Sequence, residues 1–277
     1  MELTRSTHGI FLFQKKYALE LLQDTGLTTA KPISCPLDPA VKLQKLGSDL
    51  FHDPTAYRRL IGRLVYLTNT RPDISFSVGL LSQFMDKPMI EHHQAALRIL
   101  KYVKMSPSLG LFFPTVSDHK LTAFADADWG SCLDTRRSTT GYCFFYGQAL
   151  LSWKSKKQHT VARSSAEAEY RSLAAATCEA QWLSYLLADL HLPVKEPITL
   201  FCDNRSAIHI ANNPVFHERT KHIDMDCHIV REKVLARLIH LLPIASHQQT
   251  ADIFTKTLHP EPFSTLLTKL NLKSFYG

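Results

Sequence analysis

The fold of this chain is decided by LTAFAD at residues 121–126, a run of strand-forming residues that ends on an aspartate. A second run of this kind, ITLFCD, occupies residues 198–203. In an α/β sheet the functional site usually lies at the carboxyl ends of strands, where acids reach the rim without burying an isolated charge. Asp126 and Asp203, which end these runs, are therefore candidates for one site.

Two further acidic motifs accompany the strands. SSAEAEY at residues 164–170 has the composition of a helix start, and TADI at 250–253 carries Asp252, which we expect to open the last helix. Taken singly, acids in a first helical turn commonly do no more than stabilise the helix dipole. Taken in order, four acids on separate elements can converge, and such like charges repel unless cations lie among them. The pattern favours Mg²⁺ or Mn²⁺, which prefer hard oxygen ligands.

The first strand alternates Leu, Ala and Ala with Thr, Phe and Asp, so Asp126 belongs to one face of the strand at its end. Asp128 lies on the same face, but we expect it beyond the end of strand pairing. Asp126 is therefore the stronger candidate.

The composition is that of a packed intracellular protein. Of 277 residues, 45% are apolar, which is ample for a core, and the length fits two domains or one large one. The net charge of +7 favours polyanionic partners, although only weakly on its own. The six cysteines form no C-x-x-C pair, and the sequence has neither signal-peptide order nor an apolar run of membrane-spanning length. We expect reduced cysteines, a cytoplasmic or nuclear location, and no membrane partner.

Hydrophobic periodicity divides the chain near residues 106–118. Before this point it predicts a strand at 9–13, a helix at 14–24 and three further helices at 57–67, 74–85 and 90–103. After it, the expected strands are 121–126, 140–146, 149–154, 197–202 and 238–243, and the expected helices are 165–190, one from about 204, and 222–235. Strands followed by alternating helix and strand predict a mixed parallel and antiparallel sheet.

Seven motifs in order carry a family resemblance. The ribonuclease H domain of copia-type retrotransposon Pol polyproteins is similar to FADADW (124–129), RRSTTGY (136–142), SWKSKKQ (152–158), SSAEAEY (164–170), CDN (202–204), RTKHID (219–224) and ADIFTK (251–256). In the first part, YRRLIG (57–62) and TRPDISF (70–76) resemble the segment that links the reverse transcriptase palm to that ribonuclease H. The resemblance covers nearly the whole chain.

The resemblance implies an α/β fold, a ribonuclease H-like mixed five-stranded sheet with flanking helices, preceded by a small α-helical thumb- or connection-like domain. The implied domains are a palm remnant at 1–35, the helical domain at 36–115 and the ribonuclease H-like domain at 116–277.

The resemblance also implies a site. Asp126, Glu169, Asp203 and Asp252 match the four metal-binding carboxylates of the family. Glu169 is preferred over Glu167 because its surroundings resemble the Ala-Glu-Leu of other ribonuclease H domains, with Ser164 five residues earlier. The implied cofactor is a pair of Mg²⁺ ions, with Mn²⁺ as a substitute, that activate water and stabilise the leaving 3′ oxygen during hydrolysis of the RNA strand of an RNA/DNA hybrid.

A second set of side chains is expected to hold the hybrid, with basic groups on phosphates and the indole on a sugar. The alternative interpretation is a solvated hairpin rim. The set comprises Arg136, Arg137, Trp153, Lys154, Lys156, Lys157 and Asn204.

The polymerase centre of the family needs a Tyr-x-Asp-Asp run, and this sequence contains none. The expected activity is therefore that of an endonuclease without polymerisation, whose partners are the hybrid and the remainder of the Pol polyprotein, including the palm. The competing hypothesis is an inactive or domesticated fragment that binds nucleic acid or a protein partner without cutting.

Overall fold

The computed structural model describes residues 1–47, 49–213 and 224–275. It divides into two compact units, one formed by Met1–Val116 with Lys256–Gly277 and the other by Ser117–Thr255. The motif at 219–224 and the start of the helix expected at 222–235 fall, up to residue 223, outside the described residues.

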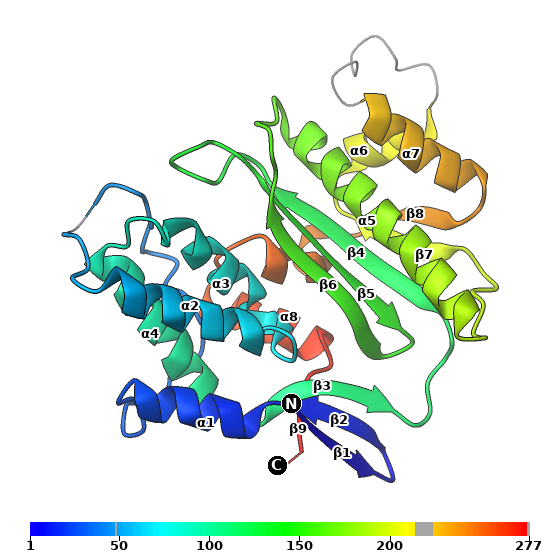
Figure 1. Ribbon diagram of the computed structural model, residues 1–277. Coiled ribbons are helices and arrows are strands. Elements are labelled where there is room, and N and C mark those ends of the chain that lie inside the picture. The colour runs from blue at the N-terminus through cyan, green and yellow to red at the C-terminus, as the bar shows by residue number, and fades with distance from the viewer. Residues whose placement is uncertain (48, 214–223, 276–277) are drawn as a thin grey trace. The chain divides into compact units, whose positions relative to one another are not determined.

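The second unit is built on a five-stranded sheet in the order β6-β5-β4-β7-β8 (Figure 1). The β4–β5 and β5–β6 pairs are antiparallel, whereas β4–β7 and β7–β8 are parallel. The predicted mixed five-stranded sheet is thereby confirmed. The strands are β4 (Leu121–Asp128), β5 (Thr139–Tyr146), β6 (Ala149–Lys157), β7 (Ile198–Cys202) and β8 (Ile239–Pro243).

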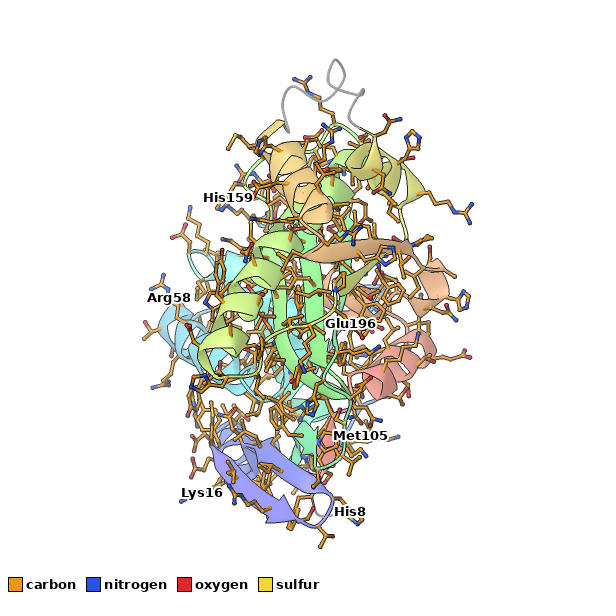
Figure 2. The ribbon with its side chains drawn as sticks, turned by 90° about the vertical axis from the view of Figure 1, so that its right-hand side faces the viewer. His8, Lys16, Arg58, Met105, His159 and Glu196 are labelled. Carbon is orange, nitrogen blue, oxygen red and sulfur yellow. The ribbon has the colours of Figure 1, made fainter. Side chains whose placement is uncertain are left out.

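Helices cover one face of this sheet. The long α5 (Ser165–Asp189) packs on β4 and contacts α6 (Arg205–Asn212) and α7 (Asp224–Leu235), as Figure 1 and Figure 2 show. The core between α5 and β4 contains Ala123 and Ala125, both 0% exposed. Because side chains alternate along a strand, Asp126 points to the opposite face, on which the 3-10 segment η6 (Thr250–Phe254) packs.

The first unit contains the four expected helices together with α8, which the sequence did not predict there. They are α1 (Lys15–Asp24), α2 (Pro54–Leu67), a 3-10 turn η1 (Pro72–Ile74) leading into α3 (Ser75–Leu81), a second 3-10 turn η2 (Ser82–Phe84), α4 (Ile90–Met105) and α8 (Pro260–Lys269). Asp53 caps α2 by accepting the Ala56 N–H at 2.9 Å, and Pro54 follows at the first helical position.

The first unit also holds a four-stranded sheet, of which the sequence predicted only the strand at 9–13, now confirmed as β2. Four antiparallel strands lie in the order β1-β2-β3-β9. They are β1 (Glu2–Ser6), β2 (Gly9–Phe13), β3 (Leu109–Pro114) and β9 (Lys273–Ser274). β3 follows Pro107 and reads in the sequence as a break after a helix, because only the distant β2 and β9 provide its hydrogen-bonding partners.

The C-terminal residues belong to this first unit. β9 pairs with β3 through Lys273 and Gly110, and Phe263 of α8 lies edge-on to Tyr102 of α4, with ring centroids 5.4 Å apart. The second unit therefore ends at Thr255, well before the end of the segment 116–277 in which the sequence places a ribonuclease H-like domain.

A buried ion pair organises the helices of the first unit. Arg71, 2% exposed, donates to both carboxylate oxygens of Asp73, and the shortest of these bonds is 2.7 Å. Tyr102 donates to the same carboxylate at 2.6 Å, and Arg71 also donates to the Ser106 carbonyl at 3.1 Å. The TRPDISF motif thus joins the start of α3 to α4. Among the described helices, none combines the length and apolar character needed to cross a membrane.

Candidate active site

Asp126 lies near the carboxyl end of the central strand β4 and is 1% exposed. Its carboxylate accepts a hydrogen bond from the Thr255 hydroxyl, and its backbone carbonyl accepts one from Ser172 of α5 at 2.7 Å. The residue is therefore held from both faces of the sheet, by α5 through the backbone and by the end of η6 through the side chain.

A glycine allows η6 to approach this strand closely. Gly141 of β5 is directly opposite Asp126, and a Cβ atom there would lie 2.5 Å from Thr255 Cγ2 and 2.9 Å from Phe254 Cβ. The buried Gln249 side chain also donates to the Ala125 carbonyl at 2.9 Å and fixes the start of η6 against β4. Sequence reasoning assigned no role to Gln249 or Thr255.

Asp252 lies in this η6 segment and is half-buried. The expectation that it opens the last helix is wrong, because α8 begins only at Pro260 and belongs to the other unit. The Thr255 hydroxyl contacts both the Asp126 carboxylate and, at 3.3 Å, the Asp252 carbonyl. Thr255 thereby connects the backbone of Asp252 to the carboxylate of Asp126.

Glu167 and Glu169 of α5 have different surroundings. Ser164 caps the helix by accepting the Glu167 N–H at 3.2 Å, and the Glu167 carboxylate accepts the Arg163 N–H at 2.7 Å. The same carboxylate forms an ion pair with Arg171 at 2.8 Å. Glu167 is therefore engaged in stabilising the helix start, whereas Glu169 contributes to an acidic cluster.

That cluster joins α5 to the end of β7. One ligand atom each from Glu169, Cys202 and Asp203 lies within 4.8 Å of the other two. Burial raises the pKa of the Cys202 thiol, and the charges of Glu169, Asp203 and Asp126 raise it further. Two of the four predicted carboxylates, Glu169 and Asp203, thus lie beside one thiol. The sequence contained Cys202 within the CDN motif, but its place in a run of apolar strand residues indicated only a core position.

Asp128 has a structural role at the end of β4. The expectation that pairing ends before it is wrong, since Asp128 pairs with Thr139 of β5. Its carboxylate accepts hydrogen bonds from the Thr139 N–H and the Ser131 hydroxyl. These contacts hold the start of the connection from β4 to β5.

The residues expected to hold a hybrid are divided between the two faces of the sheet. Residues directly opposite in neighbouring antiparallel strands share a face, and Asp126 pairs with Gly141, which in turn pairs with Ser155. Trp153 and Lys157, two residues to either side of Ser155, therefore lie on the Asp126 face. Lys154 and Lys156 lie on the α5 face, where both are exposed.

The other three residues of that set lie in connections. Arg136 and Arg137 are exposed in the connection between β4 and β5, and Arg136 adopts a positive φ of 54°. Asn204 caps α6, because its side-chain oxygen accepts the Ala207 N–H at 3.0 Å. The NH₂ group of the same side chain can donate hydrogen bonds to a ligand.

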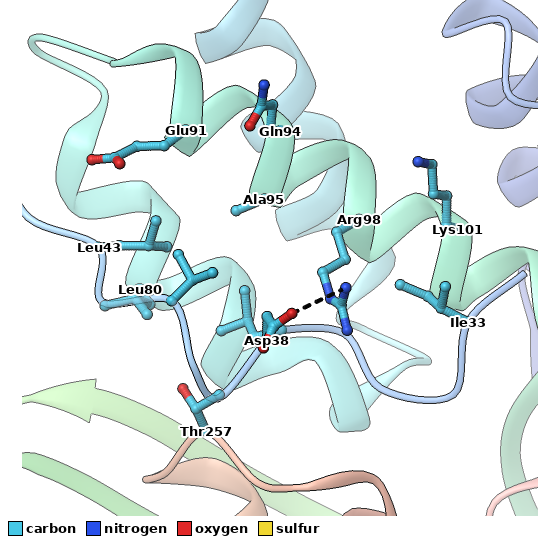
Figure 3. A pocket seen from close by; sticks show the side chains of 12 residues that line it. Ile33, Asp38, Leu43, Leu80, Glu91, Gln94, Ala95, Arg98, Lys101 and Thr257 are labelled. Carbon is cyan, nitrogen blue, oxygen red and sulfur yellow. Dashed lines mark ion pairs between the residues drawn. The ribbon is translucent and has the colours of Figure 1, made fainter. Parts of the chain in front are cut away.

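A cavity in the first unit contains none of the predicted site residues (Figure 3). It encloses about 490 Å³ between the segment around Asp38 and α4. Asp38 and Arg98 both line it and form an ion pair of 3.6 Å. The carboxylate site and this cavity are thus separate features of separate units.

No protein-family model matches the chain. The retrovirus-related Pol polyprotein from transposon RE1 of Arabidopsis thaliana is 42% identical over 272 residues, which are 98% of this chain and 19% of that polyprotein. The Pol polyprotein from transposon TNT 1-94 of Nicotiana tabacum is 35% identical over 94% of this chain and 20% of its own length. A solved ribonuclease H1 isolated from compost overlaps 54% of this chain and 99% of its own at 16% identity, with a TM-score of only 0.37.

The strand order and the carboxylates at the ends of β4 and β7 define a ribonuclease H-like α/β protein. The chain belongs to the retrovirus-related Pol polyproteins of copia-type transposons, as its identity with two of them along nearly its whole length shows. It spans about a fifth of the length of these relatives.

Proposed function

We propose that this chain is a divalent-metal-dependent endonuclease that hydrolyses the RNA strand of RNA/DNA hybrids. The observation that carries the proposal is the approach of Glu169 on α5 to Asp203 at the end of β7, beside the parallel strand β4, which carries the buried Asp126 near its own carboxyl end. The relationship to Pol polyproteins supports a nuclease of the ribonuclease H type.

The donor set fits a hard divalent cation. Asp126 and Glu169 are 1% and 6% exposed, and a carboxylate oxygen of Glu169 lies within 4.8 Å of one of Asp203. Carboxylates at such a distance are disfavoured unless a cation neutralises them. Carboxylate oxygens from two strands and two helical segments are the ligands that Mg²⁺ and Mn²⁺ prefer. We assign Asp126, Glu169, Asp203 and Asp252 as the residues that would hold two such ions.

When bound, two divalent ions would supply an activated water and a stabilised leaving 3′ oxygen. The protein orients the ligands for this chemistry. Thr255 donates a hydrogen bond to the Asp126 carboxylate and so fixes the orientation of that carboxylate. Asp126 is contacted from α5 through Ser172 and from the end of η6 through Thr255, so it would hold metal together with acids from both elements.

The hybrid would lie at the edge of the sheet where β4 and β7 end, because η6 covers the middle of the Asp126 face of β5 and β6. On that face Trp153 offers an indole for a sugar and Lys157 an ammonium for a phosphate. Arg136 and Arg137 in the neighbouring connection, Lys154 and Lys156 on the exposed edge strand and the Asn204 amide would add further contacts. The first unit would correspond to the end of a reverse transcriptase, with its palm remnant at 1–35 and a connection-like part at 36–115, and would associate with the remainder of a Pol polyprotein.

Cleavage of a labelled RNA/DNA hybrid by the purified chain with Mg²⁺ tests the proposal. We expect cleavage with 5′-phosphate and 3′-hydroxyl ends, and its loss in Asp126→Asn. Glu196→Gln, which changes an exposed carboxylate paired only with Lys120 at 2.9 Å, is the matched control and should cleave normally. An unchanged rate in Asp126→Asn would overturn the assignment.

The competing hypothesis of a binding fragment predicts a different pair of results. Such a fragment would bind the hybrid without cleaving it and would show no heat of Mg²⁺ binding in isothermal titration calorimetry. The proposed nuclease should show Mg²⁺ binding that Asp126→Asn weakens.

A further inference from the structure

Cys132 and Lys157 form a pair beside the candidate site. The Lys157 ammonium nitrogen lies 2.7 Å from the Cys132 sulfur. Cys132 lies in the connection between β4 and β5, and Lys157 is the last residue of β6. Both side chains are half-buried, so a small oxidant can reach them.

Backbone hydrogen bonds hold the two residues together. The Arg136 N–H donates to the Cys132 carbonyl at 2.7 Å, and the Cys132 N–H donates to the Arg137 carbonyl at 3.3 Å, which closes the connection into a turn. At the other side, Lys157 pairs with Thr139, and the Gln158 N–H donates to the Ser138 carbonyl at 2.8 Å. The contact is therefore built by the sheet rather than by the chance meeting of two surface side chains.

This environment distinguishes Cys132 from three other cysteines. Burial acts to raise the pKa of its thiol, but hydrogen bonds from Lys157 and Thr135 and the charge of Lys157 outweigh that effect and lower the pKa. Burial raises the pKa of Cys143, Cys178 and Cys202. Because the thiolate is the form that reacts with oxidants, Cys132 should react before these three.

We propose that Cys132 and Lys157 are a peroxide-sensitive pair that closes into a covalent sulfur–nitrogen link. Hydrogen peroxide would first convert the Cys132 thiolate into a sulfenic acid and release hydroxide. That hydroxide would take one proton from the Lys157 ammonium, and the amine would then attack sulfur and expel the sulfenic oxygen as water.

The two steps balance. One thiolate, one ammonium and one hydrogen peroxide give one sulfenamide and two waters. Sulfur is oxidised by two electrons, and the peroxide is reduced by the same two. Addition of a thiol such as dithiothreitol would cleave the sulfur–nitrogen bond and restore both side chains.

The link would have a consequence for the activity, which rests on the proposed function. Lys157 shares the sheet face of Asp126 and Asp128, and the link would remove its positive charge and tie the β4–β5 connection to the edge strand. Hybrid binding should weaken, and the slope of log affinity against log salt should fall by about 1, as for the loss of one phosphate contact.

Mass spectrometry of the full chain after peroxide treatment tests the pair directly. We expect a peptide that joins residues 132 and 157 and is lighter by two hydrogens than its two parts, and we expect dithiothreitol to release it. Cys132→Ser and Lys157→Arg should both abolish the joined peptide. Cys178→Ser, which removes an exposed cysteine, is the matched control and should retain it.

Two results would overturn the pair. One is a Cys132 sulfenic acid that accumulates without joining Lys157, and the other is a joined peptide that persists in Lys157→Arg. This readout does not depend on hybrid cleavage, so a failure of the proposed function leaves it intact. If cleavage is found, Cys132→Ser should cleave normally and resist peroxide, with its melting temperature confirming that it folds; inhibition equal to that of the unmodified chain would sink the functional consequence.

Discussion

At the scale of the residue, the site depends on polar groups whose importance appears only in three dimensions. Thr255 donates to Asp126, Gln249 fixes η6 to β4, and the Cys202 thiol lies beside Glu169 and Asp203. Glu167 and Asp128, which look equivalent to their acidic neighbours in the sequence, are instead engaged by backbone N–H groups. Acids that are close neighbours in the sequence thus have different hydrogen-bond partners and different structural roles.

The Thr255 hydroxyl provides a residue-scale prediction. Thr255→Val keeps the shape of the buried side chain and removes its donor, so the Asp126 carboxylate should lose its orientation while the fold persists. We expect hybrid cleavage to fall about 10- to 100-fold, as is usual for partners that orient metal ligands. The measurement is the cleavage rate as a function of Mg²⁺ concentration.

Its control is Thr265→Val, which removes a hydroxyl that donates to the Glu261 carbonyl at 3.1 Å on an exposed turn of α8. This variant should cleave as the unmodified chain does. Equal rates for Thr255→Val and Thr265→Val would show that the Asp126 contact does not matter.

At the scale of the element, the close approach of η6 to β5 decides whether Asp252 reaches the other acids. The sequence presents η6 as the start of a helix, since TADIF has helix-compatible residues, but the short 3-10 segment is held by Gln249 and by the Ser155 hydroxyl, which donates to the Phe254 carbonyl at 2.7 Å. The absence of a side chain at Gly141 is the condition for this packing.

Gly141→Ala tests that packing. The added methyl group would meet Thr255 and Phe254 below normal contact distance, so η6 must shift, and we expect a loss of about 1–3 kcal/mol in the free energy of unfolding. Urea denaturation followed by circular dichroism gives this value.

Gly62→Ala is the control, because a Cβ at that exposed position of α2 meets nothing within 4 Å. In a helix interior this change should be stabilising by about 0.5–1 kcal/mol. If Gly141→Ala were as stable as Gly62→Ala, the close packing of η6 against Gly141 would be disproved.

At the scale of the whole molecule, the chain is two compact units, each with its own core. The first unit is completed by the last residues of the sequence, since β9 adds to β3 and Phe263 packs on Tyr102. Its interior contains the Arg71–Asp73–Tyr102 network. Because the two charges are buried, removing either one would leave the other without its counter-ion and destabilise the unit.

Asp73→Asn should destabilise the first unit strongly, because it leaves the buried Arg71 charge without its counter-ion. We expect a loss of about 3–5 kcal/mol, measured by denaturation and by limited proteolysis within residues 1–116. Asp24→Asn breaks the exposed Arg63–Asp24 pair of 2.7 Å in the same unit and should cost at most about 1 kcal/mol. Similar losses in the two variants would argue against a structural role for the buried network.

The sequence by itself determined the strands and helices of the second unit, because alternating and helical periodicity are local properties, and the strands that end on Asp126 and Asp203 pointed to one edge of one sheet. It also determined the family, through motifs kept in order. Only the tertiary structure decided that β3 is a strand, that residues beyond Thr255 complete the first unit, and that Cys202, Gln249 and Thr255 lie at the candidate site. Those features depend on contacts between residues far apart in the chain, such as Thr255 with Asp126 and Lys273 with Gly110. Local sequence patterns do not predict such contacts.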